Sequence, residues 1–411
     1  MTLNIDTGDT TWMLIATGLV MMMTPALGFF EAGLIRSKNS ISVLIQTFSG
    51  LGILSILWIV IGFTLAFGPS FNGIIGGTQY VAMDNVPINE PFQNYATSIP
   101  GIGFVAFNMM VAVITPLLIT GAFAEKMKWT SFCIFMIAWS VLIYCPLAHW
   151  VWGGGWLSQI GFYDFGGGIV VHVSAGMGSL AAALILGRRK YFGPDITLPH
   201  NVPLAIIGAS LLWLGWYGFN AGGAYAAGGL TFNILLVTHM ASATSSITWI
   251  LLTWKTAGRP SVIAGINGAI AGLAGVTAAS GFITINSAMV LGVVIGIVSF
   301  LAIKLIKEKL KIDDVLDVSS VHGISGIVGT LAVGILAVQT INPNGPNGIL
   351  AGNFSQIGIQ VVGIGAAILL SFGGTFIIMK IIDKTMGLRV KEIEEDVGLD
   401  ISEHAERAYT K

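Results

Sequence analysis

Two histidines set in strongly apolar sequence are the residues of this chain best suited to chemistry. His172 lies in DFGGGIVVHVSAG, and His322 lies in DVSSVHGISG about 150 positions later. Each is followed by a glycine at the fourth position, Gly176 and Gly326. A neutral imidazole both donates and accepts a hydrogen bond, so two imidazoles in contact can share one proton and relay it. Because burial disfavours the charged form, we expect a mainly neutral pair that accepts a proton transiently.

Metal binding and enzyme catalysis fit these histidines less well. A protein metal site has three or four ligands, and two histidines without a third fall short of that number. Cys133 and Cys145 lie in one apolar run, so they offer neither a disulfide framework nor a metal-ligand spacing. No nucleophile or carboxylate pair accompanies the histidines, so the sequence predicts neither an enzyme nor a cofactor. A single buried histidine is more often a packing residue, and this is our interpretation of His239.

Membrane-spanning helices are predicted to position the histidines. Of the 411 residues, 54% are hydrophobic and only 9% are charged, whereas soluble domains contain about 25% charged residues. Apolar runs of about 20 residues, enough to cross a bilayer of roughly 30 Å as helix, recur along the chain. The sequence therefore predicts an all-α integral membrane protein with eleven transmembrane helices, near residues 11–34, 42–67, 99–123, 130–153, 167–187, 202–223, 229–254, 261–280, 283–305, 320–340 and 357–382.

The basic residues predict the orientation. Counted from the first span, the odd-numbered connections and the C-terminal segment hold all 19 lysines and arginines, and the even-numbered connections hold none. By the positive-inside rule the N-terminus lies outside and the C-terminus in the cytoplasm of a multi-pass cell-membrane protein. The first residues carry no positive n-region, so we expect the first span to be retained. A net charge of -1 gives no sign of a nucleic-acid partner.

The chain divides into a transmembrane domain, residues 1–386, and a charged cytoplasmic tail, residues 387–411. In the tail, Asp400 and Glu403 have the spacing of a capping box for a short helix. A disordered tail is the alternative interpretation.

Similar motifs in corresponding spans predict an internal duplication. The first span contains FFEAG and the sixth GFNAG, while the fifth contains VVHVSAG and the tenth SVHGISG. Because five is odd, the second half must cross the membrane upside down, as a five-plus-five inverted repeat followed by an extra C-terminal helix. Functional sites of inverted repeats lie near the midplane, so His172 and His322 are expected to approach each other there.

Several other polar and aromatic residues have two interpretations. Asp164 is predicted to cap the N-terminus of the fifth span, and it can also lend negative charge to a cation site. Trp152 is equally well explained by an interfacial aromatic belt and by a cation site, because an indole face attracts a small cation. Three aspartates before the tenth span are expected to cap it: Asp313, Asp314 and Asp317.

Eight ordered blocks of the sequence resemble the ammonium transporter (Amt/Mep/Rh) family, most closely its prokaryotic Amt members. The blocks are LVMMMTPALGFFEAGLIRSKN, ITGAFAEKM, AHWVWGGGWL, DFGGGIVVHVSAG, LLWLGWYGFNAGG, INGAIAGLAGVTA, DDVLDVSSVHGISG and GLDISEHAERAY. They cover essentially the whole chain.

The resemblance implies specific roles. His172 and His322 match the twin histidines of an apolar pore, which would relay protons. Phe219 matches the inner gate phenylalanine, and Trp152 and Phe107 match the tryptophan and a further aromatic of the external ammonium site. Asp164 matches an aspartate needed for uptake, and Trp216 and Thr277 match two pore-lining residues. The resemblance also implies a homotrimer in the lipid bilayer and a PII-type regulatory protein that docks at the cytoplasmic face.

Three positions depart from the family pattern. The second gate phenylalanine is replaced by Val111, and the serine that recruits ammonium is replaced by Gly223. Ala405 stands where the tail motif usually has glycine. Valine has no aromatic face and glycine no hydroxyl acceptor, so we expect altered ammonium recruitment.

The resulting prediction is a transporter that recruits NH4+ outside, deprotonates it and passes NH3 through the pore, with net proton transfer. The alternatives are an ammonium sensor with little flux and an Rh-type neutral gas channel.

Overall fold

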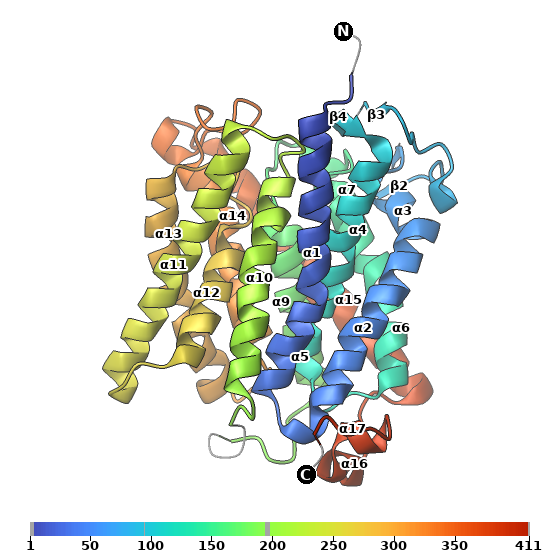
Figure 1. Cartoon of the computed structure of the whole chain (residues 1–411), viewed down its shortest axis with the longest axis vertical. Helices are drawn as coiled ribbons and strands as arrows, with labels where there is room; N and C mark the ends of the chain where they lie inside the picture. Colours follow the sequence, from blue (N-terminus) through green and yellow to red (C-terminus); the bar gives the residue numbers. More distant parts are fainter. Residues whose placement is uncertain (1–3, 94, 194–197, 410–411) are drawn as a thin grey trace.

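The computed structural model describes residues 4–93, 95–193 and 198–409, which form one bundle of helices (Figure 1). The N-terminus lies at one end of the bundle and the C-terminus at the other. We call these ends the N-terminal face and the C-terminal face. The predicted all-α membrane architecture is confirmed.

Ten helical stretches of the described residues are long and apolar enough to cross a membrane. In chain order these are α1 (Thr7–Leu34); η1 (Ser37–Asn39) with α2 (Ser40–Leu57), η2 (Trp58–Gly62) and α3 (Phe63–Phe67); α4 (Gly101–Leu117) with α5 (Thr120–Phe123); α6 (Trp129–Trp139) with η4 (Ser140–Tyr144), α7 (Cys145–Val151) and α8 (Trp156–Gln159); η5 (Gly168–Val173) with α9 (Ser174–Leu186); α10 (Val202–Gly222); α11 (Gly229–Ala257); α13 (Ile285–Ile303) with η6 (Lys304–Lys309); η7 (Ser319–Ile324) with α14 (Ser325–Leu336); and α15 (Ser355–Met386).

The predicted eighth span is shorter than expected. It appears as α12 (Val262–Val276), which has 15 residues and is followed by a series of turns. Since about 20 residues are needed to cross the hydrocarbon core, the predicted count of eleven full-length spans is not confirmed. Most of α12 is buried in the bundle, where close packing against α11 and α13 supports a short helix.

Small elements cover the N-terminal face. Two antiparallel pairs of strands lie there, β1 (Ser70–Phe71) with β2 (Ile75–Gly76) and β3 (Pro91–Phe92) with β4 (Ala96–Pro100). In these pairs Phe71 lies opposite Ile75, and Phe92 opposite Ala96. Single helical turns, η3 (Val81–Met83) and η8 (Ile349–Ala351), complete the loops.

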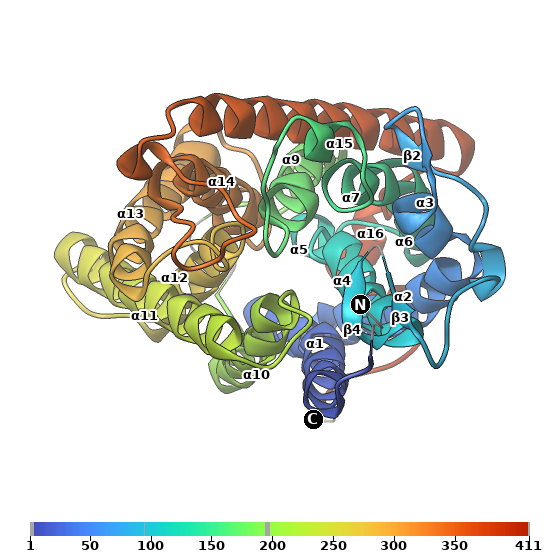
Figure 2. The ribbon, with the colours of Figure 1, turned by 90° about the horizontal axis from the view of Figure 1, so that it is seen from above.

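Corresponding spans of the two halves pack on each other. Helix α1 runs along α10, the first helix of the second half (Figure 1). The contact is close because α10 presents glycines: a Cβ atom at Gly208 would lie 2.3 Å from the Phe30 nitrogen. The fifth span, η5 and α9, likewise packs on the tenth, η7 and α14. The spans that carry the matching motifs thus lie side by side. Outside these spans, α15 crosses one side of the bundle (Figure 2).

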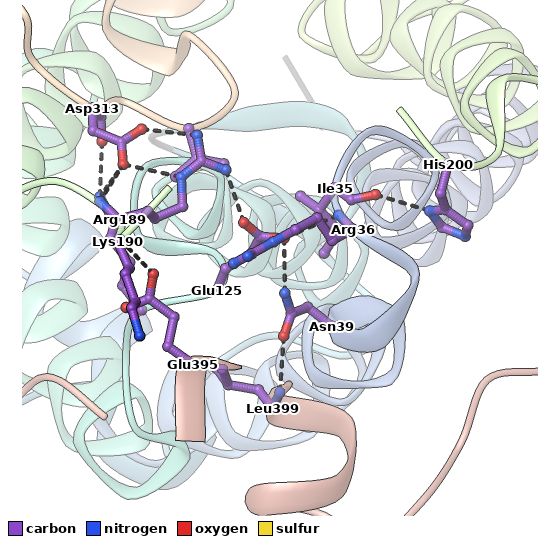
Figure 3. A network of polar contacts seen from close by, with 12 residues as sticks. Ile35, Arg36, Asn39, Glu125, Arg189, Lys190, His200, Asp313, Glu395 and Leu399 are labelled. Atoms are coloured by element: carbon purple, nitrogen blue, oxygen red, sulfur yellow. Dashed lines mark hydrogen bonds and ion pairs between the residues drawn. The ribbon is translucent and has the colours of Figure 1, made fainter. Parts of the chain in front are cut away.

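A network of buried charges joins the two halves at the C-terminal face (Figure 3). The Arg189 guanidinium donates to Glu125 Oε2 at 2.8 Å and to the two oxygens of Asp313 at 2.9 and 3.0 Å. Arg36 Nε donates to Glu125 Oε1 at 2.9 Å. Burial opposes ionisation of both carboxyl groups, but the neighbouring cations outweigh it, so the pKa values of Glu125 and Asp313 lie below their ordinary value. Burial also lowers the pKa of Lys126 to about 8, although Asp313 favours its ammonium form.

Two of the three aspartates expected to cap the tenth span do not do so. Asp314 is a cap, since its Oδ2 accepts from the Ser319 nitrogen at 2.7 Å. Asp313 instead holds Arg189, and Asp317 Oδ1 accepts from Lys307 Nζ at 2.9 Å. Nearby cations outcompete the helix N-terminus for these two carboxylates.

The tail forms two short helices, α16 (Glu392–Val397) and α17 (Leu399–Ser402), and its predicted capping box is wrong. Asp400 Oδ1 accepts from the Ser42 nitrogen at 2.9 Å, in the first turn of α2. Glu403 Oε2 accepts from the Trp129 nitrogen at 3.0 Å, at the start of α6. The two carboxylates therefore cap helices of the bundle and not a helix of the tail.

Ala405, the departure noted in the tail motif, adopts φ = 54°. This left-handed conformation costs an L-residue other than glycine roughly 1–2 kcal/mol. A glycine at this position would avoid that cost, while the neighbouring contacts of Asp400 and Glu403 hold the tail in place here.

Candidate functional site

Two cavities follow one another from the N-terminal face into the bundle. The outer one, the vestibule, has a volume of about 430 Å³ and is formed where the segments before η5 and after α10 and α14 meet. The inner one has a volume of about 20 Å³ and is walled mainly by apolar side chains of α1, α4 and α10. Phe219 lines both cavities, so its ring lies between them. Six residues singled out from the sequence line the vestibule: Phe107, Val111, Trp152, Asp164, Phe219 and Gly223.

The two histidines meet beside the inner cavity. His172 lies in η5 and His322 in η7, and each of these segments is a single turn of π-helix at the corresponding place of its half. The two Nδ1 atoms are 3.2 Å apart. One of them must donate and the other accept, so the neutral pair shares one hydrogen between two nitrogens. His172 Nε2 is buried without a hydrogen-bond partner among the described residues.

The glycines that follow the histidines explain this approach. A Cβ atom at Gly176 would lie 2.2 Å from the Gly323 Cα atom, and one at Gly326 would lie 2.9 Å from the His172 Cβ atom. Each glycine therefore faces the backbone or histidine of the other half, and any larger residue would separate the two turns.

Trp216 and Phe219 of α10 cover the histidines. The Trp216 ring stacks on His172 with centroids 5.4 Å apart, and Phe219 lies 6.3 Å from the same imidazole. Trp216 Nε1 donates to Thr277 Oγ1 at 3.0 Å. Trp216 lines the inner cavity, whereas Thr277 lies behind its indole and orients it.

Asp164 and Trp152 are joined at the rim of the vestibule. Asp164 accepts from the backbone nitrogens of Gly167, Gly168 and Ile169 at 2.6 to 2.8 Å, so its carboxylate caps η5. Burial raises the pKa of Asp164, although these N–H groups favour the carboxylate. Trp152 Nε1 donates to the Asp164 carbonyl oxygen at 2.9 Å, which fixes the indole against the vestibule. The carboxylate oxygens are thus occupied by backbone donors.

Comparison with known proteins gives the family. A model of the Ammonium Transporter Family matches residues 11–409. The chain belongs to the ammonium transporter family. It is accordingly a multi-pass membrane protein and not an enzyme.

Relatives and solved structures agree along the whole length. The chain is 47% identical over 408 residues to "Ammonium transporter 1" of Dictyostelium discoideum, covering 98% of this chain and 88% of the relative. It is 40% identical to "Ammonium transporter" of Bacillus subtilis, covering 98% of each. The structure of Saccharomyces cerevisiae Mep2 matches with a TM-score of 0.88 at 33% identity, over 94% of this chain and 91% of that one. A structure described as "Sensor Amt Protein" matches with a TM-score of 0.88 at 30% identity, over 97% and 98%.

Sequence reasoning missed several vestibule residues of this transporter, among them Asn108 and Tyr225. Asn108 is buried on α4, one turn before Val111, and Tyr225 follows the end of α10. Tyr225 lies two positions beyond Gly223 in FNAGGAY, just outside the motif LLWLGWYGFNAGG. Its φ of 50° could not be inferred from the residue type.

Replacing Gly176 with alanine is expected to destabilise this transporter and to reduce ammonium uptake. The new methyl group would overlap the Gly323 backbone, and overpacking of this kind costs roughly 1–3 kcal/mol. Thermal unfolding in detergent and uptake by proteoliposomes measure the two effects. Gly358→Ala is the matched control, since a Cβ atom at this helical glycine of α15 would meet no atom within 4 Å. Equal unfolding temperatures for the two variants would contradict the proposed close approach.

Proposed function

We propose that this transporter recruits NH4+ in the vestibule, removes a proton and passes NH3 along the inner cavity past His172 and His322. The observation that carries the proposal is the 3.2 Å contact between the two Nδ1 atoms directly behind Phe219. This contact supplies a proton carrier at the point where the path becomes apolar.

Recruitment rests on the aromatic lining of the vestibule. The faces of Trp152 and Phe107 attract a cation by roughly 0.5–2 kcal/mol each, depending on desolvation. The Asp164 carboxylate adds negative charge from behind its hydrogen-bonded cap. Its contribution is electrostatic, because its oxygens already accept from backbone nitrogens.

Deprotonation follows from the size and polarity of the inner cavity. A cavity of about 20 Å³ has room for about one small molecule, so a hydrated cation cannot enter. An unpaired charge in apolar surroundings is strongly disfavoured, whereas neutral ammonia carries no such penalty. The N–H bond of NH4+ breaks, its electron pair stays on nitrogen, and the proton passes to an unprotonated imidazole nitrogen of the pair. Transfer of that proton along the pair makes transport electrogenic, and potassium is excluded because it has no proton to release.

The proposed transporter has one orientation in the membrane. The N-terminal face lies outside and the C-terminal face in the cytoplasm, because the basic residues gather at the latter. Residues 1–386 form the transmembrane domain and residues 387–411 the cytoplasmic tail. Exposed apolar side chains on α11 and α13 contact lipid or the other subunits of a homotrimer. A PII-type regulator docks on the tail and on the loops that the tail caps.

A sensor with little flux is the second candidate. It is favoured by the similarity to the protein described as "Sensor Amt Protein" and by Val111 and Gly223 in the vestibule. A neutral gas channel of the Rh type is the third, and it differs in moving no charge.

Currents from purified protein on a solid-supported membrane separate these functions. A pulse of ammonium is expected to give a sustained current, and an equal pulse of potassium none. Uptake of ammonia without current would support the gas channel. Ammonium binding with neither current nor uptake would support the sensor and would overturn the transport mechanism.

A further inference from the structure

Two residues of the vestibule lining, Val111 and Gly223, have neither a side-chain acceptor nor an aromatic ring for a cation. Val111 presents methyl groups, and Gly223 presents no side chain. Ammonium differs from an alkali cation in carrying N–H groups, so a selective outer site needs hydrogen-bond acceptors. The acceptors must therefore come from other residues of the same cavity.

Asn108 and Tyr225 place two acceptors in this cavity. Asn108 Nδ2 donates to the Phe104 carbonyl at 2.9 Å and to Tyr225 Oη at 3.1 Å. The carbonyl can only accept, which fixes the amide with its nitrogen toward it. Both amide hydrogens are then used, and the Asn108 carbonyl oxygen is left as an acceptor. The Tyr225 hydroxyl receives one hydrogen bond and keeps a further lone pair.

The rings around these acceptors form an aromatic wall. The Tyr225 ring meets Phe107 edge to face with centroids 5.7 Å apart, and it lies 5.2 Å from Phe104. All three rings line the vestibule. A cation at this wall would meet π faces together with oxygen acceptors.

The backbone of Tyr225 is held in an uncommon conformation. Its φ of 50° lies in the left-handed region, which is unfavourable for a residue with a side chain. Contacts to α1 fix the turn: Asp9 Oδ1 accepts from the Ala227 nitrogen at 2.7 Å, and Trp12 Nε1 donates to the Ala221 oxygen at 3.2 Å. Backbone strain that is maintained by surrounding contacts occurs most often at functional sites.

We propose that Tyr225 and Asn108 form the acceptor side of the outer cation site in this transporter. The site takes small cations that carry N–H donors, ammonium and methylammonium, in preference to alkali cations. This inference rests on the proposed function and assigns the specificity of its first step to residues other than Val111 and Gly223. Trp152 supplies an aromatic face of the same vestibule.

Tyr225→Phe tests the proposal, because it keeps the ring and removes only the hydroxyl. We expect its dissociation constant for ammonium, measured by calorimetry on detergent-solubilised protein, to rise about tenfold, the effect of losing a hydrogen bond to a charged group. Tyr225→Ala also removes the ring and is expected to weaken binding further. In currents, the half-saturating ammonium concentration of Tyr225→Phe is expected to rise while the maximal current is retained.

Tyr144→Phe is the matched control. Tyr144 is buried outside the vestibule and its hydroxyl has no hydrogen-bond partner among the described residues, so this variant removes the same hydroxyl group and is expected to bind ammonium like the wild type. An unchanged dissociation constant for Tyr225→Phe, in protein with an unchanged unfolding temperature, would overturn the proposal. If the wild type binds ammonium but carries no current, the proposed transport fails, while the binding comparison still decides the role of Tyr225.

Discussion

Replacing both His172 and His322 with alanine is expected to abolish selective ammonium transport. The variant loses the paired imidazoles, and with them the proposed proton carrier between the vestibule and the rest of the path. The remaining lining is apolar, where an unpaired charge costs several kcal/mol. Since each 1.36 kcal/mol changes a rate tenfold, we expect the ammonium current to fall by more than about a hundredfold.

Two measurements on proteoliposomes check this expectation. The first is the current after an ammonium pulse, and the second is the leak of potassium, because the space freed by two imidazoles could admit a larger cation. Loss of current, or a current no longer selective for ammonium, agrees with the proposed relay. Selective ammonium uptake at the wild-type rate would contradict the proposed relay.

His239→Ala provides the control for the loss of an imidazole as such. His239 Nδ1 lies 2.7 Å from Tyr217 Oη, between α10 and α11, and His239 does not line the inner cavity. We therefore expect this variant to transport ammonium like the wild type. The contact with Tyr217 also supports our interpretation of His239 as a packing residue.

Replacing Arg189 with methionine is expected to destabilise the folded protein by about 3–5 kcal/mol, the usual effect of removing one partner from a buried ion pair. Arg189 joins Glu125 and Asp313, whose side chains are fully buried. Without the guanidinium, burial would oppose both carboxylates, and the two halves would lose the Arg189–Asp313 ion pair at the C-terminal face. Thermal unfolding at neutral pH measures the effect.

The adjacent Arg188 supplies the control. Arg188 is exposed, and its Nε donates to the Lys311 oxygen at 2.7 Å, so Arg188→Met removes the same charge from the surface. Its effect on stability is expected to be small. Equal effects of the two substitutions would show that the buried network adds nothing beyond surface charge.

The lowered pKa values predict how the contribution of this network to folding stability changes with pH. The pKa values of Glu125 and Asp313 are lowered in the folded protein, so their contribution is complete above the ordinary carboxyl pKa of about 4. It is lost as the pH falls from there through the lowered folded values. The difference in stability between wild type and Arg189→Met is therefore expected to shrink in acid.

The sequence determined the helical membrane architecture because hydrophobic length is a local property of the chain. Apolar runs located ten of the helical spans, and the FFEAG and GFNAG motifs indicated a duplication; the packing of α1 on α10 was added by the structure. The same reasoning overestimated the eighth span, because α12 ends where turns begin inside a buried part of the bundle. The apolar setting of His172 and His322 and the repeated motifs around them singled out these two histidines, and the structure brings them together.

Contacts between distant segments were decided only by the tertiary structure. Asp400 and Glu403 have the spacing of a local cap, yet they accept from N–H groups of α2 and α6, which the fold of the tail brings within hydrogen-bond distance. Tyr225 carries no periodic signal, and its position in the vestibule depends on a left-handed turn held by α1. A pattern along the chain specifies which face of a helix is apolar. Which polar groups meet across the bundle depends on how the helices pack. Packing therefore decided the contact between Tyr225 and Asn108 and the contacts of the tail.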